Sequence, residues 1–258
     1  MAKHLKSIYA LILFLVIVLS FSVSCSRLKQ KKSYIVATSP DNPPMEMITK
    51  DNKITGFDID LIKFISEKSN FDINIIPVIK ENLIYGLIDG TYNIVISGIT
   101  FSTELKTKYP DVLFSKPYLK IGDVIVISED FYNFKGISDL TGKTVGIKNN
   151  SAAEEVLKKY PKIKITKYKS ISNAFTDLAR NKISAVVTDL PIAAQFVYYN
   201  DEYRGIFKIV NIPLTKKEYV IAVNKSNQEL LKKINSSINL LEKSGELNNL
   251  IIKWFFKK

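Results

Sequence analysis

The residue types best suited to catalysis are scarce in this sequence of 258 residues, which has one cysteine, Cys25, and one histidine, His4. A single cysteine cannot form an internal disulfide bond. Removal of the first 24 residues would leave no histidine, and hence no Ser-His-Asp triad, Cys-His pair or histidine-based zinc site. Carboxylate, lysine or tyrosine chemistry remains, but histidine is the commonest catalytic base. We therefore expect a protein that is not an enzyme and that holds no cofactor or metal.

The N-terminal segment has the composition of a secretory signal peptide. Lys3 and Lys6 form a basic start, residues 8–19 are an uninterrupted apolar run, and small residues then lead to Cys25. A membrane-spanning helix needs roughly 20 apolar residues, which is more than this run provides. We therefore expect residues 1–24 to be a cleaved signal and the mature protein to be exported.

Cys25 resembles the cysteine of a bacterial lipoprotein lipobox, where the new N-terminal thiol receives diacylglycerol. The usual pattern has leucine three residues earlier, where this chain has Ser22, preceded by Phe21. The polar residues 25–32 would form a lipidated tether. We expect a cell-envelope protein, lipid-anchored to a membrane on its extracytoplasmic (periplasmic) side. The alternative is a plain signal cleaved near an unpaired or buried cysteine.

The formal charge of +12 raises the question of a nucleic-acid partner. Loss of Lys3 and Lys6 leaves +10, scattered along the chain, and no segment combines arginine with aromatic residues as a nucleic-acid groove does. We therefore expect no nucleic-acid partner, and attribute the charge to nearby anionic lipid headgroups or to a lysine-rich background. With 46% hydrophobic and 24% charged residues, the chain is long enough for one large or two smaller globular domains.

The elements that must position any site alternate between short apolar strands and amphipathic helices. This repetition predicts an α/β fold with largely parallel sheets, covered by helices on both faces. Ligands of such sheets bind beyond the carboxyl ends of the strands. The predicted strands cover residues 34–38, 73–76, 94–97, 124–127, 144–147, 163–168, 184–188 and 219–223, and the predicted helices 57–65, 83–88, 152–160, 172–181 and 228–243.

An ordered set of short motifs runs along the chain and is more specific than any one of its members. The set comprises Pro43-Pro44, TGFDIDL at 55–61, LxxGxY at 87–92, SGIT at 97–100, FSxPY at 114–118, LxGKxVG at 140–146, NSAAE at 150–154, AVVxD at 185–189, SGEL at 244–247 and KWF at 253–255. In this order the motifs resemble the family 3 solute-binding proteins, the extracellular receptors of polar amino-acid ABC importers. The resemblance covers nearly everything after the tether.

The resemblance implies the two-lobed periplasmic-binding-protein fold of type II, with two crossovers between α/β lobes that close on a small ligand. Lobe 1 would comprise residues 33–120 and 216–258, and lobe 2 residues 121–215. The crossovers near Lys120 and Lys216 would absorb the closing movement.

The resemblance also implies which residues bind the ligand. A ligand buried between lobes loses water, so each of its charges needs a partner. Asp189 stands where the family places an acid against the ligand's ammonium group. Backbone and hydroxyl groups of Ser97, Gly98 and Thr100 would approach from lobe 1. Ser151 opens a helix whose unpaired amides and dipole favour a carboxylate.

Two of these residues have a purely structural alternative. Ser151 and Glu154 have the spacing of a capping box, so Ser151 could serve only as a helix cap. Asp189 could instead cap a helix that begins near Pro191.

Three positions depart from the family pattern, and all three belong to the implied pocket. Leu105 occupies the place of the arginine that clamps the ligand carboxylate, while Asn42 and Lys80 stand where the family places aromatic residues. Lys80 could supply the missing cation as a point charge, or could be a solvated surface lysine. Lys106 follows Leu105 directly, but one helical step turns it about 100° away.

We therefore expect the extracytoplasmic substrate-binding component of an ABC importer, monomeric, with an amino acid or related small amine as ligand. Its partners would be a membrane permease and its ATPase, with the membrane itself contacted through the N-terminal lipid. One alternative is a surface lipoprotein of the same fold that acts as an adhesin or sensor. The other is an enzyme resembling the exported cyclohexadienyl dehydratases, which the absence of the arginine and of histidine disfavours.

Overall fold

The computed structural model describes residues 31–210 and 213–256. The expected signal peptide (1–24), the lipidation site Cys25 and most of the tether lie outside these described residues. Residues 33–258 form one compact unit, to which all the elements named below belong. Within the described part of the chain, no helix has the length and apolar character that a bilayer span requires.

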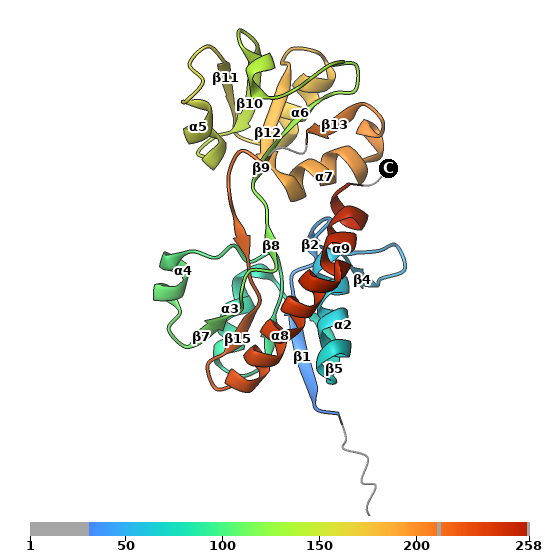
Figure 1. Ribbon diagram of the computed structural model, residues 1–258, viewed down its shortest axis with the longest axis vertical. Coiled ribbons are helices and arrows are strands. Elements are labelled where there is room, and N and C mark those ends of the chain that lie inside the picture. The colour runs from blue at the N-terminus through green and yellow to red at the C-terminus, as the bar shows by residue number, and fades with distance from the viewer. Residues whose placement is uncertain (1–30, 211–212, 257–258) are drawn as a thin grey trace, which may run out of the picture. The chain divides into compact units, whose positions relative to one another are not determined.

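The first five-stranded sheet combines strands from the beginning of the unit with one from near its end (Figure 1). Its order is β5-β1-β6-β15-β7. Strand β1 pairs in parallel with β5 and β6, whereas β15 pairs antiparallel with β6 and β7. The strands are β5 (Asp72–Pro77), β1 (Ser33–Thr38), β6 (Ile94–Val95), β15 (Ala222–Asn224) and β7 (Val112–Phe114).

Three longer helices pack together beside this sheet. Helix α2 (Phe57–Ser69) carries its buried residues at helical spacing and contacts both α8 (Gln228–Ser244) and α9 (Glu246–Phe255). It ends at Asn70, whose φ of 53° is a left-handed conformation that asparagine tolerates. The remaining elements of this part are β2 (Asp41–Asn42), β3 (Glu46–Ile48), β4 (Ile54–Thr55), η1 (Lys80–Asn82), α3 (Leu83–Ile88) and α4 (Thr103–Lys108).

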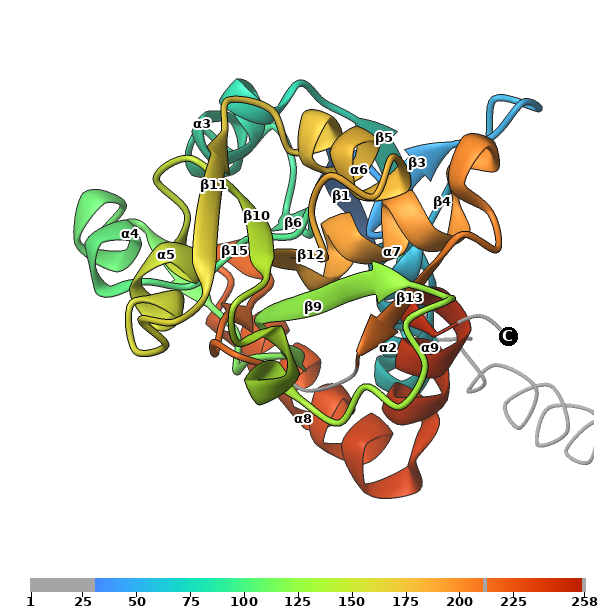
Figure 2. The same ribbon diagram turned by 90° about the horizontal axis from the view of Figure 1, so that it is seen from above.

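The second five-stranded sheet has the order β11-β10-β12-β9-β13 (Figure 2). Strand β10 pairs in parallel with β11 and β12, and β9 pairs antiparallel with β12 and β13. The strands are β11 (Lys164–Tyr168), β10 (Thr144–Lys148), β12 (Ala185–Asp189), β9 (Asp123–Ser128) and β13 (Phe207–Val210). The helical segments between them are η2 (Ile137–Leu140), α5 (Ala152–Leu157), α6 (Ile171–Ala179), α7 (Leu190–Tyr198) and η3 (Asp201–Tyr203).

Helices cover both faces of this second sheet, as strand alternation requires. On β9, Ile125 and Ile127 belong to the apolar cluster that includes Leu157 of α5. Their neighbours Val124 and Val126 point the other way, into the cluster that contains residues of α6 and α7.

Two adjacent chain segments connect the two sheets. Strand β8 (Leu119–Lys120) pairs antiparallel with β14 (Glu218–Tyr219), and Ile121 exchanges backbone hydrogen bonds with Lys217. Gly122 follows at a point where a Cβ atom would lie 2.1 Å from the backbone oxygen of Thr215. The crossovers therefore touch so closely that only glycine fits at position 122.

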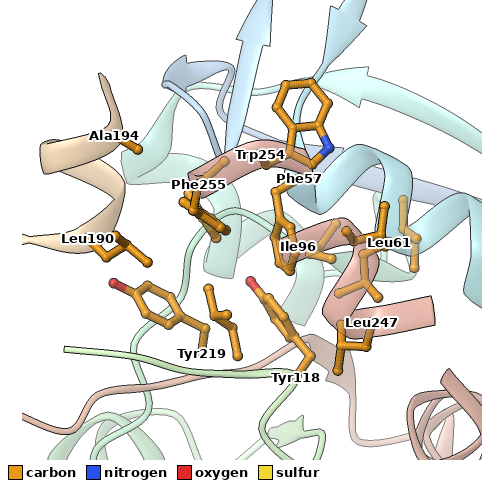
Figure 3. Close-up of a cluster of buried hydrophobic side chains, with 14 of the residues drawn as sticks. Phe57, Leu61, Ile96, Tyr118, Leu190, Ala194, Tyr219, Leu247, Trp254 and Phe255 are labelled. Atoms are coloured by element: carbon orange, nitrogen blue, oxygen red, sulfur yellow. The ribbon is translucent and has the colours of Figure 1, made fainter. Parts of the chain in front are cut away.

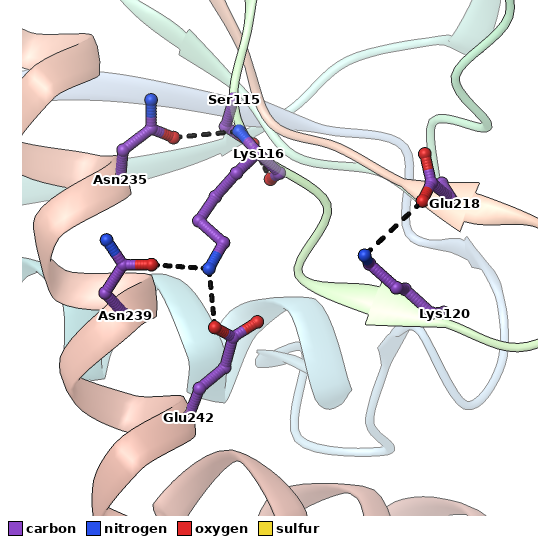
Figure 4. A network of polar contacts seen from close by, with 7 residues as sticks. All are labelled: Ser115, Lys116, Lys120, Glu218, Asn235, Asn239 and Glu242. Carbon is purple, nitrogen blue, oxygen red and sulfur yellow. Dashed lines mark hydrogen bonds and ion pairs between the residues drawn. The ribbon is translucent and has the colours of Figure 1, made fainter.

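Polar contacts join the two crossovers to each other and tie the segment that leads into the first crossover to helix α8 (Figure 4). An ion pair of 3.5 Å joins Lys120 to Glu218 across β8 and β14. The backbone N–H of Lys116 donates to Asn235 Oδ1 of α8 at 2.8 Å, and its Nζ binds Glu242 of the same helix.

The largest apolar cluster draws residues from both sheets and from helices α2, α6, α7, α8 and α9. Figure 3 shows the part of it around Phe57, Tyr118 and Phe255. At its centre Phe57 lies 5.1 Å from Phe255 and 6.1 Å from Tyr118, measured between ring centroids. Leu190 of α7 belongs to the same cluster. Tyr199, at the end of α7, donates a hydrogen bond to the Trp254 carbonyl of α9.

The predicted α/β class is confirmed, but the prediction of largely parallel sheets is wrong. Of the eight strand pairings in the two five-stranded sheets, four are antiparallel. The chain passes from one sheet to the other twice, and after each passage it enters the new sheet directly, as β9 and as β15, with no helix in between. Parallel neighbours need a longer connection, usually a helix, so these two strands pair antiparallel. The predicted strand 219–223 is accordingly divided between β14 and β15, and the predicted helix 152–160 ends at Leu157.

Candidate functional site

The carboxyl end of β12 carries Asp189, the acid expected to meet a ligand's ammonium group. Asp189 stands at the N-cap position of α7, but its side chain makes no capping hydrogen bond to that helix. The carboxylate instead binds the ammonium group of Lys217, and its side chain remains 26% exposed. An accessible carboxylate at a strand end is thus already engaged by an amine.

A second acid, Asp123, lies directly across from Asp189 in the antiparallel strand β9. Its side chain is 4% exposed, accepts a hydrogen bond of 2.9 Å from Thr215 Oγ1 and lies 3.9 Å from Lys217 Nζ. Burial and then the neighbouring Asp189 raise the pKa of Asp123 to about 6, while Lys217 and Thr215 oppose this rise. Two carboxylates therefore share one lysine ammonium group at the crossovers.

Neither Asp123 nor Lys217 emerged from the sequence. Asp123 directly precedes a predicted apolar strand, but this position does not reveal which residue of a neighbouring strand lies opposite Asp123. The antiparallel register between β9 and β12, with Asp123 facing Asp189, is a tertiary feature. The one available signal was the position of Asp123 and Lys217 at the two predicted crossovers.

The loop that begins at Ser97, expected to contact the ligand from lobe 1, is fastened to two buried acids. Ser97 Oγ donates to Glu46 Oε1 at 3.1 Å and accepts from the backbone N–H of Ser39 at 3.0 Å. The backbone N–H of Gly98 donates to Asp58 Oδ2 at 2.7 Å. The hydroxyl of Ser97 and the amide of Gly98 thus serve to hold the loop.

Glu46 and Asp58 form a carboxyl pair beneath this loop. Their residues are 1% and 0% exposed. Burial raises the pKa of both acids, and the charge of Asp58 raises that of Glu46 further, whereas the Gly98 N–H lowers that of Asp58. Glu46 Oε2 and Asp58 Oδ1 are buried and have no hydrogen-bond partner among the described residues. Because two carboxylates in one buried site cannot both ionise, the pair holds one proton near neutral pH.

Asn42 and Thr100 flank this loop in different ways. Asn42 Nδ2 donates to Glu46 Oε1 at 3.3 Å, and a Cβ atom at Gly98 would lie 2.9 Å from the same nitrogen. Asn42 therefore supports the loop from the side. Thr100 is exposed and forms a backbone bridge with Tyr219, so its side chain is the accessible one of the three expected contacts.

Lys80 and Leu105, the other two departures from the family pattern, lie on short helical segments. Lys80 is exposed in η1 and lines a surface hollow of about 430 Å³ together with Ser39 and Asp41. Leu105 lies half-buried in α4, where its N–H is capped by Ser102 Oγ at 3.0 Å. The structure thus gives Lys80 access to solvent and leaves Leu105 without polar function.

Ser151 precedes α5, as expected, but the predicted capping box is absent. Its side chain caps no amide of the helix, and its Oγ is buried with no hydrogen-bond partner among the described residues. Glu154 binds Lys167 at 2.6 Å instead. Ser151 therefore stands at the N-cap position of α5 without a side-chain capping hydrogen bond.

The chemistry available at the crossovers is the binding of a cation. The two acids present oxygen acceptors to an amine, as their contact with Lys217 shows. Within residues 31–210 and 213–256, no group of three or more histidine, cysteine, aspartate or glutamate side chains is placed to hold a metal ion.

Two α/β sheets joined by paired crossovers, with acids where the crossovers meet, define a two-lobed binding protein of type II. Residues 34–257 match the bacterial extracellular solute-binding proteins, family 3, and the chain belongs to this family.

Named relatives of the chain are binding proteins. It is 28% identical over 219 residues to the ABC transporter arginine-binding protein 1 of Escherichia coli (strain K12), covering 83% of this chain and 86% of that one. It is 31% identical over 228 residues to the arginine-binding extracellular protein ArtP of Bacillus subtilis (strain 168), covering 87% of each. Among solved structures, an ancestral cationic amino acid solute-binding protein is similar with a TM-score of 0.68 and 30% identity, covering 86% of this chain and 95% of that one.

Proposed function

We propose that this chain is the extracytoplasmic substrate-binding component of an ABC importer and that its ligand is an amino acid, with cationic amino acids the first candidates. The observation that carries the proposal is the accessible carboxylate of Asp189, which makes no capping hydrogen bond to α7 and binds an amine. The relatives named for arginine binding, and the solved structure named for cationic amino acids, support the same ligand class.

The lobes of this receptor would be residues 33–120 with 216–258, and residues 121–215. These boundaries lie in the paired crossovers, between the strands of the two sheets. The ligand would bind where β12 ends and the crossovers meet, and closure of the lobes would present it to a permease and its ATPase. We propose a binding role for the monomer rather than a catalytic one, since the named relatives are binding proteins.

A thermal-shift panel of the twenty amino acids, together with small polyamines, tests this function. A receptor gains melting temperature with micromolar ligand, because the ligand stabilises only the folded state. At a ligand concentration 100 times Kd the gain in stability is about 2.7 kcal/mol. A melting temperature unchanged by every compound would contradict the proposal and favour the adhesin alternative.

We further propose that Cys25 is lipidated and anchors the receptor to a membrane. The polar tether that follows it supports this, since two acyl chains suffice for stable anchoring where one is marginal. Expression of the parent and of Cys25→Ser in a bacterial host, followed by detergent partitioning, should find the parent in detergent and the variant in the aqueous phase. Mass spectrometry that found an unmodified N-terminus beyond Cys25 would refute the anchor.

A further inference from the structure

Lys217 is a charged group of the crossovers to which the proposed function gives no role. Its side chain is 24% exposed, and its ammonium group contacts Asp189 and lies 3.9 Å from Asp123 Oδ1. Its ammonium group thus occupies the position on Asp189 that a ligand's ammonium group would take.

An amino acid brings opposite charges into this site on a single carbon atom. Its ammonium and carboxylate groups are therefore only a few ångströms apart, so the cation that receives the carboxylate must lie beside the acid that receives the ammonium. Each charge that loses water needs such a partner. Lys217 meets this requirement through its contact with Asp189, whereas Lys80 is exposed in η1 and contacts neither acid among the described residues.

The surroundings of Lys217 allow its ammonium group to turn toward a ligand. Asp123 keeps the hydrogen bond from Thr215 Oγ1 when Lys217 moves, so the more buried acid is not left without a partner. The backbone of Lys217 is held by its two hydrogen bonds to Ile121, which fix the base of the side chain while the long stem rotates.

We propose that Lys217 is the specificity-determining cation of the site: it receives the carboxylate of the bound amino acid while Asp189 receives the ammonium group. The inference rests on the proposed function and adds to it a requirement for a free carboxylate. The Asp189–Lys217 pair is in this account an ion pair that a zwitterion opens, each ligand charge replacing one partner of the pair.

Matched ligands with and without a carboxylate test this role. Titration calorimetry would measure L-arginine against agmatine, L-lysine against cadaverine and L-histidine against histamine. The proteins are the parent, Lys217→Met, Lys217→Arg and, as the matched control, the exposed neighbour in Lys216→Met. Thermal unfolding of each variant checks that it folds.

We expect Lys217→Met to weaken binding of the amino acid about tenfold to a hundredfold, the loss of one charge-assisted hydrogen bond. Binding of its amine should stay the same or tighten, because Asp189 is then no longer occupied by Lys217. Lys217→Arg should restore most of the amino-acid affinity, and Lys216→Met should change neither ligand. Tighter binding of both ligands by Lys217→Met would overturn the inference and make Lys217 a competitor for the acids. Equal weakening of both, or no change in either, would also overturn it.

The outcome for the parent separates this inference from the proposed function. If the parent binds an amino acid and Lys217→Met does not distinguish it from its amine, only the role of Lys217 fails. If neither the parent nor Lys217→Met binds any compound of these pairs or any other amino acid, the proposed function fails and the inference with it.

Discussion

At the scale of single residues, the protein has two pairs of acids that are buried or partly buried, and the negative charge of each pair is compensated in a different way. Asp123 and Asp189 share a lysine, whereas burial raises the pKa of Glu46 and of Asp58 and so favours a single shared proton over ionisation of both. The first arrangement leaves an accessible carboxylate for a ligand, and the second fixes the loop at Ser97 and Gly98.

The shared proton predicts how stability depends on pH. The pKa of Glu46 is raised in the folded state, so the folded protein binds more protons than the unfolded chain above the ordinary pKa of glutamate. The contribution of Glu46 to the free energy of unfolding is therefore fully present below the ordinary pKa of glutamate, and it is lost as pH rises toward the pKa of Glu46 in the folded protein. We expect the unfolding free energy of the parent to fall relative to Glu46→Gln between pH 5 and pH 8, by up to about 1.4 kcal/mol per pH unit.

Urea unfolding at several pH values measures this difference. The control is Glu155→Gln, because the Glu155 side chain is 75% exposed and should show no such trend. Parallel pH profiles for the parent and Glu46→Gln would show that Glu46 is ionised when folded and would end the account of a shared proton.

Lys80 supplies the second prediction at this scale. Because it is exposed in η1 and Lys217 is proposed to take the ligand carboxylate, Lys80→Ala should change the affinity for amino acids by no more than about twofold. Titration calorimetry on Lys80→Ala, with Lys106→Ala as an exposed control, gives the answer. A loss of tenfold or more confined to Lys80→Ala would instead assign the carboxylate to Lys80.

At the scale of elements, the sequence predicted a helix or strand where the pattern of apolar residues within that segment alone determines it. Apolar periodicity predicted α2 and α8, and short apolar runs predicted β1 and β9, because the burial of a helix face or of a core strand shows in the residues of the segment itself. The sequence did not predict that β9 and β15 pair antiparallel with their neighbours, because this depends on the point at which each crossover joins its sheet.

Residues of the candidate site likewise differ in whether a local sequence motif or only a tertiary contact brings them to the site. Asp189 could be predicted because its motif is continuous in sequence, whereas its neighbour Asp123 depends on strand register. Asp58 belongs to a predicted motif too, but its bond to Gly98, forty residues away, is a tertiary contact that no local pattern contains.

The crossovers carry the prediction at this scale. Gly122→Ala should destabilise the protein by about 1–3 kcal/mol, the usual effect of overpacking, since the new methyl would meet the Thr215 carbonyl. Gly136→Ala is the matched control, because a Cβ atom there has no neighbour within 4 Å and its backbone is extended. Chemical denaturation compares the two. Equal stability of both variants would show that the crossovers do not pack as closely as the structure has them.

At the scale of the whole molecule, two sheets are joined by a closely packed pair of crossovers, and Asp123, Asp189 and Lys217 lie beside them. Closure by hinge motion follows from the proposed function, because a ligand that bonds to groups on both lobes favours the closed state. Small-angle scattering should show a smaller radius of gyration with saturating ligand. An unchanged radius, with binding confirmed, would remove closure from the account while leaving the site intact.

The central claim is that an amino acid binds at Asp189, and titration calorimetry of Asp189→Ala tests it most directly. With the amino acid that the parent binds best, the variant should lose about 2–5 kcal/mol of binding free energy, the range for truncating one side of a buried charge pair. Asp130→Ala, which removes an exposed acid of the same part of the chain, should bind as the parent does. An Asp189→Ala variant that binds as tightly as the parent would contradict the account and place the ligand elsewhere.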